Sequence, residues 1–176
     1  MTLTQKWLAS LSLIFALPAF ANNPPSLKIA GQGKALYMRV IKVYDAELSV
    51  SDNAVRNNVL SAGVSRCLRL DYAVDLTADK FVLAAERVLQ RQHDAATLAQ
   101  IQPQLEQFHA AYQDVKKGDV YRMCYTAATQ TTSLSLNGET LVQVNSDTFA
   151  KHYFGIWLGE KRPIAQRLRK DLLKRL

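Results

Sequence analysis

The sequence is poor in the residues and motifs from which common catalytic and cofactor sites are built. Its three histidines, at positions 93, 109 and 152, are scattered, and no His, Cys or acidic side chains have the spacing of metal ligands. Gly31-Gln32-Gly33 is expected to form a turn after a short strand at 27–30, and it lacks the third glycine and the following helix of a phosphate-binding loop. There is no Gly-x-Ser-x-Gly segment, and neither of the two cysteines has a credible histidine partner. We therefore expect no metal, no cofactor and no activated serine or cysteine nucleophile.

Long hydrophobic runs are also scarce, and the one that stands out lies at the start of the chain. An uncharged run from Trp7 to Phe20 follows Lys6 and closes on Ala19-Phe20-Ala21, which has the small-x-small form of a signal-peptidase site. The run is too short to be a typical spanning helix. We predict that residues 1–21 are a signal peptide cleaved near Ala21 and that the protein is periplasmic or secreted. An uncleaved N-terminal anchor is the alternative.

Acidic residues are few near the end of the chain, where the positive charge gathers. The formal net charge is +7, and residues 161–176 hold seven lysines and arginines against Asp171 alone. Such a cluster can attract anionic lipid headgroups or an acidic partner. The alternative is a solvated helix face with no partner. We expect no nucleic-acid partner for an exported protein, and the sequence does not indicate an oligomeric state.

The hydrophobic patterning of residues 22–176 predicts one α+β domain. Strands are expected within residues 35–50, at 65–72, at 120–127 and in a hairpin over 132–144 around Asn137-Gly138, a strong two-residue turn signal. Helices are expected at 78–90 after Thr77 as the N-cap, and over 94–112 with a new helix or a kink at Pro103. Two more are expected, one from Ser146 or Asp147 to a left-handed stop at Gly159 and one from Pro163 onward. We predict an antiparallel sheet covered on one face by helices.

Strand parity adds candidate functional residues to this outline. In a strand through residues 37–43, Arg39 shares a face with Ile41 and Val43, so its guanidinium needs a carboxylate, backbone carbonyls or a ligand anion. Cys67 and Cys124 both fall on the polar faces of their strands. A disulfide between them is reasonable if the strands are neighbours, but the sequence does not supply their separation.

Several segments together resemble one family. They are "GQGKALYMRVIKVYDAELSV", "CLRLDYAVDLTADKF", "YQDVKKGDVYRMCY" and "LSLNGETLVQVNSDTFAKHYFGIWLGEKRP". The chain is similar to the bacterial exported branch of the chalcone isomerase-like family. This resemblance implies a large antiparallel sheet, a helical layer and a ligand cleft between them. Some members of that superfamily close the ring of chalcones, and others bind fatty acids without catalysis.

The resemblance also places the family's functional positions on this chain. The cleft threonine falls on Arg39, the catalytic tyrosine on Phe81 and the asparagine two turns later on Val88, while the lysine of the central strand falls near Tyr72. Phe81 and Val88 cannot make the hydrogen bonds that ring closure needs. The resemblance therefore favours a non-catalytic binder of a fatty acid or similar amphipathic acid, with Arg39 on the carboxylate and Tyr37, Tyr72 and Phe81 lining the cleft. The alternatives are an intramolecular lyase or isomerase with a different residue set, and a membrane-surface or protein-interaction module.

Overall fold

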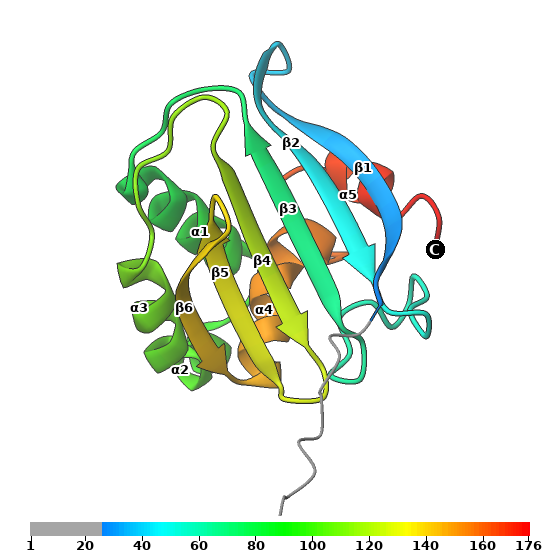
Figure 1. Ribbon diagram of the computed structural model, residues 1–176. Helices are drawn as coiled ribbons and strands as arrows, with labels where there is room; N and C mark the ends of the chain where they lie inside the picture. The colour runs from blue at the N-terminus through cyan, green and yellow to red at the C-terminus, as the bar shows by residue number, and fades with distance from the viewer. Residues whose placement is uncertain (1–25) are drawn as a thin grey trace, which may run out of the picture.

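Six strands lie in chain order across one antiparallel sheet in the computed structural model, which describes residues 26–176 (Figure 1). Each strand pairs with the next one along the chain. The predicted signal peptide, residues 1–21, lies outside the described residues. The strands are β1 (Lys28–Tyr37), β2 (Ile41–Val50), β3 (Arg66–Tyr72), β4 (Val120–Thr126), β5 (Thr131–Leu136) and β6 (Glu139–Asn145).

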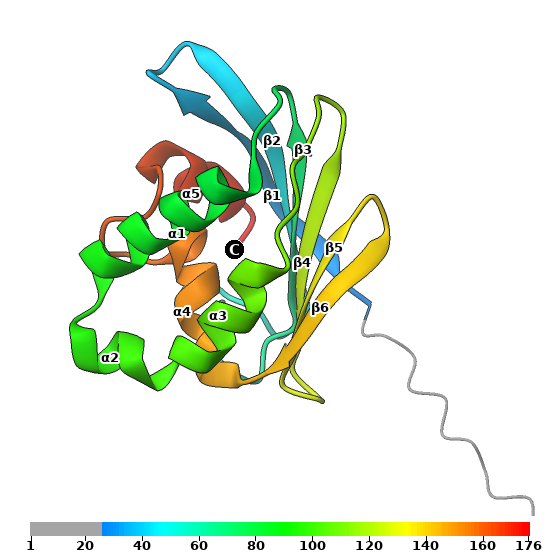
Figure 2. The same ribbon diagram turned by 90° about the vertical axis from the view of Figure 1, so that its left-hand side faces the viewer.

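The helices form a layer on one face of this sheet, as Figure 2 shows. Three of them fill the connection from β3 to β4, and the other two follow β6. This arrangement confirms the predicted α+β fold. The helices are α1 (Ala78–Gln92), α2 (Ala95–Gln100), α3 (Gln102–Ala110), α4 (Asp147–Leu158) and α5 (Gln166–Leu172). No helix among residues 26–176 is long and apolar enough to cross a membrane.

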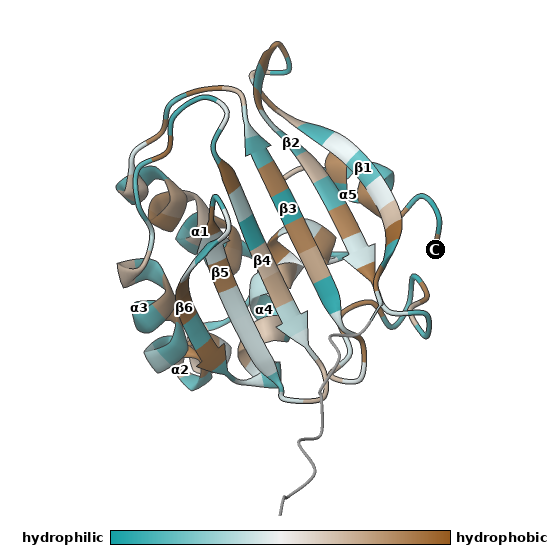
Figure 3. Ribbon diagram, in the orientation of Figure 1, coloured by the Kyte–Doolittle hydropathy of each residue, from teal (hydrophilic) through white to brown (hydrophobic). Residues whose placement is uncertain are grey.

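Alternation along the central strands decides which face the helices cover. Leu68, Leu70 and Tyr72 of β3 are buried, whereas Arg69 and Asp71 between them are partly exposed. Successive strand residues point to opposite faces, so one face of β3 packs on the helices and the other meets solvent. Figure 3 shows the same alternation of hydrophobic and hydrophilic residues along β3 and β4.

Local side-chain hydrogen bonds fix the starts of α2 and α4. The Asp94 carboxylate accepts from the Thr97 amide at 2.8 Å at the start of α2, and the Ser146 hydroxyl accepts from the Phe149 amide at 3.0 Å at the start of α4. Both helix starts were predicted. Thr77 precedes α1 as expected but makes no side-chain cap. The Ala78 amide instead donates to the Asp114 carboxylate at 2.8 Å, so a distant loop replaces the cap.

Helix α4 supplies much of the core between sheet and helical layer. Tyr153, Phe154, Ile156 and Trp157 are all buried. Each aromatic side chain of this size removes roughly 150–250 Å² from water, so the helix is a main source of hydrophobic stabilisation. The helix ends at Gly159, but with φ −62° and ψ 147° rather than in the expected left-handed conformation.

The two glycines near the start of the domain lie within β1, and the predicted turn at Gly31-Gln32-Gly33 is wrong. A Cβ atom at Gly33 would lie 2.8 Å from Leu168 of α5, and one at Gly31 would collide with the backbone carbonyl of Asp171. Glycine is needed here because the last helix approaches the strand closely. The final helix begins at Gln166, three residues after the predicted start at Pro163.

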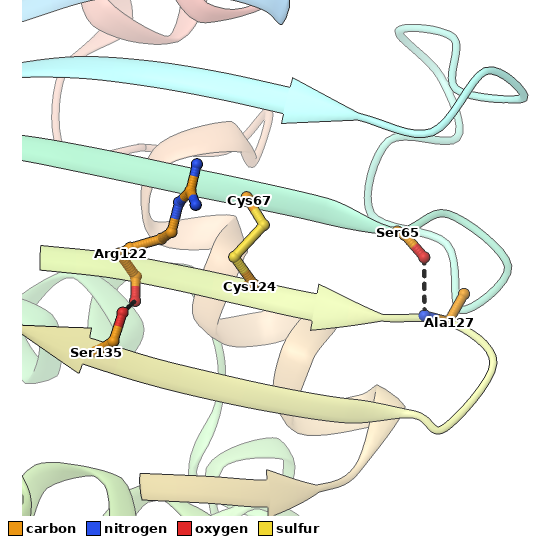
Figure 4. Close-up of a disulfide and its surroundings, with 6 residues drawn as sticks. All are labelled: Ser65, Cys67, Arg122, Cys124, Ala127 and Ser135. Carbon is orange, nitrogen blue, oxygen red and sulfur yellow. Dashed lines mark hydrogen bonds between the residues drawn. A yellow bond between two sulfur atoms is a disulfide. The ribbon is translucent and has the colours of Figure 1, made fainter. Parts of the chain in front are cut away.

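A disulfide joins Cys67 of β3 to Cys124 of β4 (Figure 4). The two residues are direct partners in the antiparallel register. Both lie on the helix-free face, as strand parity predicted. The condition that the sequence left open, whether the strands are neighbours, is met by the sheet order.

Arg66, at the start of β3, is fully buried on the helix side of the sheet. Its Nη1 donates to the carbonyls of Val59, Ser61 and Val64 at 3.3, 3.1 and 2.9 Å. The guanidinium also lies 4.5 Å from the ring centroid of Tyr125 and 4.8 Å from that of Phe154. Burial lowers the pKa of the guanidinium to about 10. Its hydrogen bonds hold the irregular segment between β2 and β3 in place.

Candidate functional site

A cavity of about 650 Å³ lies between the sheet and the helices α1 and α4. Its size falls in the range of roughly 300–1,000 Å³ that small-molecule sites occupy. Most of its wall is hydrocarbon from strands β1 to β5 and from α1 and α4. Residues with aliphatic or thioether side chains that line it include Leu68, Leu70, Met123, Leu134, Ala85 and Ile156.

Aromatic rings form one wall of this cavity, with Tyr72 at their centre. Its ring meets the rings of Tyr44, Phe81 and Tyr121 edge-to-face at centroid distances of 5.5, 5.4 and 6.0 Å. Phe81 in turn stacks on Tyr112 at 5.3 Å. Such contacts hold each ring in a fixed orientation, so the wall is preformed.

The tyrosine hydroxyls in this wall differ in how many hydrogen bonds they make within the protein. Tyr121 donates to the Gln113 carbonyl at 2.9 Å and accepts from the Gln113 amide at 2.8 Å. Tyr112 shares a hydrogen bond of 3.0 Å with Tyr153. Both hydroxyls therefore have partners within the protein.

The hydroxyls of Tyr44 and Tyr72 are left with hydrogen-bonding capacity. Tyr44 accepts from Trp157 Nε1 at 3.0 Å, which leaves its own proton available. No hydrogen bond within residues 26–176 uses the Tyr72 hydroxyl. Burial raises the pKa of Tyr44 to about 12 and that of Tyr72 well above its ordinary value, so both are neutral donors at neutral pH. A buried donor of this kind favours a polar ligand atom.

The cavity opens to solvent between the β1–β2 hairpin, helix α1 and the segment before α5. The mouth is made by lining residues that are also exposed: Leu36, Tyr37, Ile41, Leu83 and Ile164. Among the described residues that line the cavity, the charged ones are Lys80 and Arg87, and both are cationic. They are seven residues apart on α1, which places them on one helix face about 10 Å apart along the axis. The lining side chains are thus cationic at the rim of the cavity and uncharged inside it.

Three of the four predicted cleft residues line this cavity. Tyr37 lies at its mouth, Tyr72 in its wall and Phe81 beside Tyr72. The placement of Arg39 on an inward strand face is wrong. Arg39 is exposed in the turn between β1 and β2, where its φ is 65°. The prediction failed because residues 35–50 contain no glycine, proline or asparagine to indicate the turn.

A β-bulge also changes the parity near the hairpin. Ala35 pairs with Tyr44 but Leu36 pairs with Lys42, so Val43 is the extra residue of β2. Ile41 and Tyr44 consequently line the same cavity although simple alternation would put them on opposite faces. Parity counted through this segment therefore fails beyond the bulge.

Some residues of the site were not identified from the sequence. Lys80 and Arg87 are ordinary surface cations in a helical pattern, and Trp157 belongs to a run that reads as core. Buried Arg66 did carry a signal, because it shares the apolar face of Leu68 and Leu70 in a correctly predicted strand. Within residues 26–176 no group of three or more His, Cys, Asp or Glu side chains could hold a metal ion.

Comparisons with known proteins identify the class to which this fold and cavity belong. The family described as Chalcone isomerase-like matches residues 20–174. The chain therefore belongs to the chalcone isomerase-like family. No curated protein sequence matches it significantly.

One solved structure with a similar fold is the crystal structure of a fatty-acid binding protein from Arabidopsis thaliana. The superposition has a TM-score of 0.65 and covers 90% of this chain and 91% of that one, at 15% sequence identity. At this identity the likeness shows the fold alone.

Proposed function

We propose that this protein binds a fatty acid or a similar amphipathic acid in the cavity between sheet and helices, without catalysing its conversion. The observation that carries the proposal is the cavity itself, an apolar chamber of about 650 Å³ whose charged lining residues are cations at the rim. An acyl chain fits the hydrocarbon interior, and a carboxylate fits the cationic rim. The fold shared with a fatty-acid binding protein supports the same class of ligand.

The proposed pose places the carboxylate at the mouth beside Arg87. Lys80 lies 3.5 Å from the Asp79 carboxylate, whereas none of the ion pairs formed by the described residues involves Arg87. An ionised carboxylate in the interior would meet only neutral groups and would be costly to bury. The acyl chain then runs inward past Tyr37, Phe81 and Tyr72. Arg87 thus takes the role that the sequence had suggested for Arg39.

The hydroxyls of Tyr44 and Tyr72 add a second polar feature deeper in the cavity. They suit a hydroxyl or carbonyl group part-way along the ligand chain, since they are neutral donors. We therefore expect a chain that carries a mid-chain oxygen to bind more tightly than the plain saturated acid of the same length.

The residues at the family's catalytic positions favour binding over catalysis. Phe81 lines the cavity without a hydroxyl, and Val88 is a buried aliphatic residue. Loss of one donor that stabilises developing charge typically costs about 2.7–4 kcal/mol of barrier. The alternative, an intramolecular lyase or isomerase with another residue set, predicts chalcone loss well above the uncatalysed rate in a spectrophotometric assay. We expect the background rate.

We further propose that the protein belongs to the exported branch of its family and acts in the periplasm or outside the cell. The N-terminal pattern supports this proposal, and a cross-strand disulfide suits an oxidising compartment. Detection of the mature N-terminus near residue 22 in a periplasmic fraction tests it. Full-length protein in the cytosol would contradict it.

The ligand proposal is tested by titrating the purified mature protein with saturated fatty acids of increasing length. Each added methylene that enters the cavity contributes roughly 0.8 kcal/mol, so the dissociation constant should fall about fourfold per carbon until the cavity is full. Arg87→Ala should weaken binding by roughly fivefold, the upper range for a solvent-exposed ion pair. Arg91→Ala is the matched control, because Arg91 is an exposed arginine one turn further along α1 that does not line the cavity. Equal effects of the two variants would contradict the pose.

A further inference from the structure

The turn between β1 and β2 uses residues that are poorly suited to its backbone. The Val40 amide donates to the Tyr37 carbonyl at 3.2 Å, and the two central residues have positive φ, 50° at Met38 and 65° at Arg39. Turns with both central residues in this region favour Asn-Gly, because β-carbons are strained there. The β5–β6 hairpin of the same protein follows this rule, with Asn137 at φ 51° and Gly138 at φ 91°.

Apart from Arg39, the side chains at this strained turn are apolar and face solvent. Met38 is 74% exposed and Val40 is 78% exposed. Their neighbours Leu36, Tyr37 and Ile41 are also exposed large hydrophobic residues. Figure 2 shows the β1–β2 hairpin projecting past the end of the sheet on the side of the helices. We call residues Leu36–Ile41 the hairpin tip. A contiguous apolar surface of this kind marks an interaction site, and here neither packing nor turn geometry accounts for it.

Positive charge accompanies the hairpin tip. Arg39 is at its apex, and Lys42, the second residue of β2, pairs with the Asp45 carboxylate at 2.7 Å. Lys80 and Arg87 lie at the mouth of the cavity that the tip borders. A tyrosine, aliphatic side chains and cations together suit the interface of an anionic bilayer, where apolar groups enter the acyl boundary and cations meet phosphates.

The tip is also continuous with the cavity. Leu36, Tyr37 and Ile41 line the cavity mouth and belong to the tip. A surface that contacts the tip therefore lies at the opening of the apolar chamber. This continuity favours a lipid surface over a water-soluble partner, because a bilayer can supply an amphipathic ligand directly to the mouth.

From these observations we infer that the hairpin tip is a membrane-docking element that inserts Met38 and Val40 into the interface of an anionic phospholipid bilayer, with Arg39 at the headgroups. Docking in this way holds the cavity mouth against the bilayer. The inference rests on the side chains and charge of the tip, and its preference for a lipid surface over a water-soluble partner rests in addition on the proposed function.

Co-sedimentation with vesicles tests this inference. The mature protein is mixed with vesicles of phosphatidylglycerol and phosphatidylcholine, or of phosphatidylcholine alone. We expect binding to the anionic vesicles that weakens with salt. The double variant Met38→Asn with Arg39→Gly should reduce the partition coefficient by roughly tenfold, since it removes an inserting side chain and a headgroup contact. Asn-Gly is the pair of residues that a turn of this kind prefers, so we expect this variant to fold. Its loss of vesicle binding therefore reports on the side chains of the tip.

Two further variants compare the tip with the basic C-terminal helix as the source of binding. Val40→Ser keeps the strained turn and Arg39, and it should weaken vesicle binding while leaving the affinity for a soluble short-chain fatty acid unchanged. Lys170→Ser with Lys174→Ser removes positive charge from the C-terminal segment and should change vesicle binding less than twofold. If this last variant abolishes binding and the tip variants do not, the C-terminal basic cluster is the docking site and the inference is wrong.

The outcomes also distinguish this inference from the proposed function. Vesicle binding that depends on the tip, in a protein that takes no fatty acid, overturns only the proposed ligand. Fatty-acid binding by a protein that never associates with anionic vesicles at low salt overturns only the docking element.

Discussion

Removal of the Cys67–Cys124 disulfide should lower the free energy of unfolding by an amount that depends on the length of chain between the two cysteines. The relevant change is the double variant Cys67→Ser with Cys124→Ser, which is close in size and leaves a polar pair on a solvent-facing surface. Ser49 pairs with Cys67 on one side, and Ser133 pairs with Cys124 on the other. Serine at both positions therefore extends an existing row of serines, and we expect little loss of folded-state packing.

The magnitude follows from the length of chain that the disulfide closes. The two cysteines are 57 residues apart in the sequence. In the chain-entropy treatment, a loop of this length restricts the unfolded chain by about 14 cal/mol/K, or about 4 kcal/mol at 25 °C. Most domains are stable by only about 5–15 kcal/mol, so this is a large share of the total.

Urea unfolding of the two proteins measures the difference. We expect the double variant to lose about 4 kcal/mol and to show a larger urea dependence, because its unfolded state is no longer held compact by the cross-link. Ser49→Ala with Ser133→Ala is the control for changes to the same surface and should alter stability by less than about 0.5 kcal/mol. A loss below about 1 kcal/mol for the cysteine variant, or two free thiols in the folded wild-type protein, would refute the reasoning.

Two other predictions concern buried Arg66 and the half-buried histidines His93 and His152. Arg66→Met should lower the free energy of unfolding by about 1–3 kcal/mol in the same assay, because three carbonyls lose their donor, and a loss under about 1 kcal/mol would contradict this role. Acidification should also destabilise the protein, since burial lowers the pKa of both His93 and His152 and protonation then favours the unfolded state. This loss of stability begins as the pH falls through the unfolded pKa of about 6.5 and levels off below the folded pKa values. His152→Asn should flatten the dependence of the melting temperature on pH between about 7 and 5, and an unchanged slope would contradict the assignment.

The parts of the fold that follow local rules were predictable from the sequence. The Asn137-Gly138 turn, the helix starts at Asp94 and Ser146 and the orientation of Cys67 on the polar face of its strand depend on neighbouring residues only. Local propensity and a period of two are enough to find such features.

The failures lie where distant parts of the chain decide the local structure. Gly31 is in a strand rather than a turn because α5 packs against it. Arg39 was misplaced because the turn at Met38-Arg39 is held by the pairing of two long strands against residue preference. A rule broken locally in this way is expected where function imposes its own demand, as we propose for the hairpin tip.

The candidate site also combines residues that could be predicted from the sequence with features that depend on packing between distant elements. Tyr37, Tyr72 and Phe81, which were expected in a cleft, line the cavity, and their role in ligand binding stays a prediction. The hydrogen bond from Trp157 to Tyr44 and the position of Arg87 at the mouth arise from packing between elements far apart in the sequence. The pattern of one helix does not reveal which of its exposed cations borders a cavity.

Native mass spectrometry of the protein purified from its own compartment tests the central claim most directly. The account predicts a population carrying a bound mass in the range of a fatty acid or related amphipathic acid, which Arg87→Ala reduces and Arg91→Ala does not. Protein that is uniformly unliganded, and that shows no rise in melting temperature when fatty acids of any length are added, would contradict it.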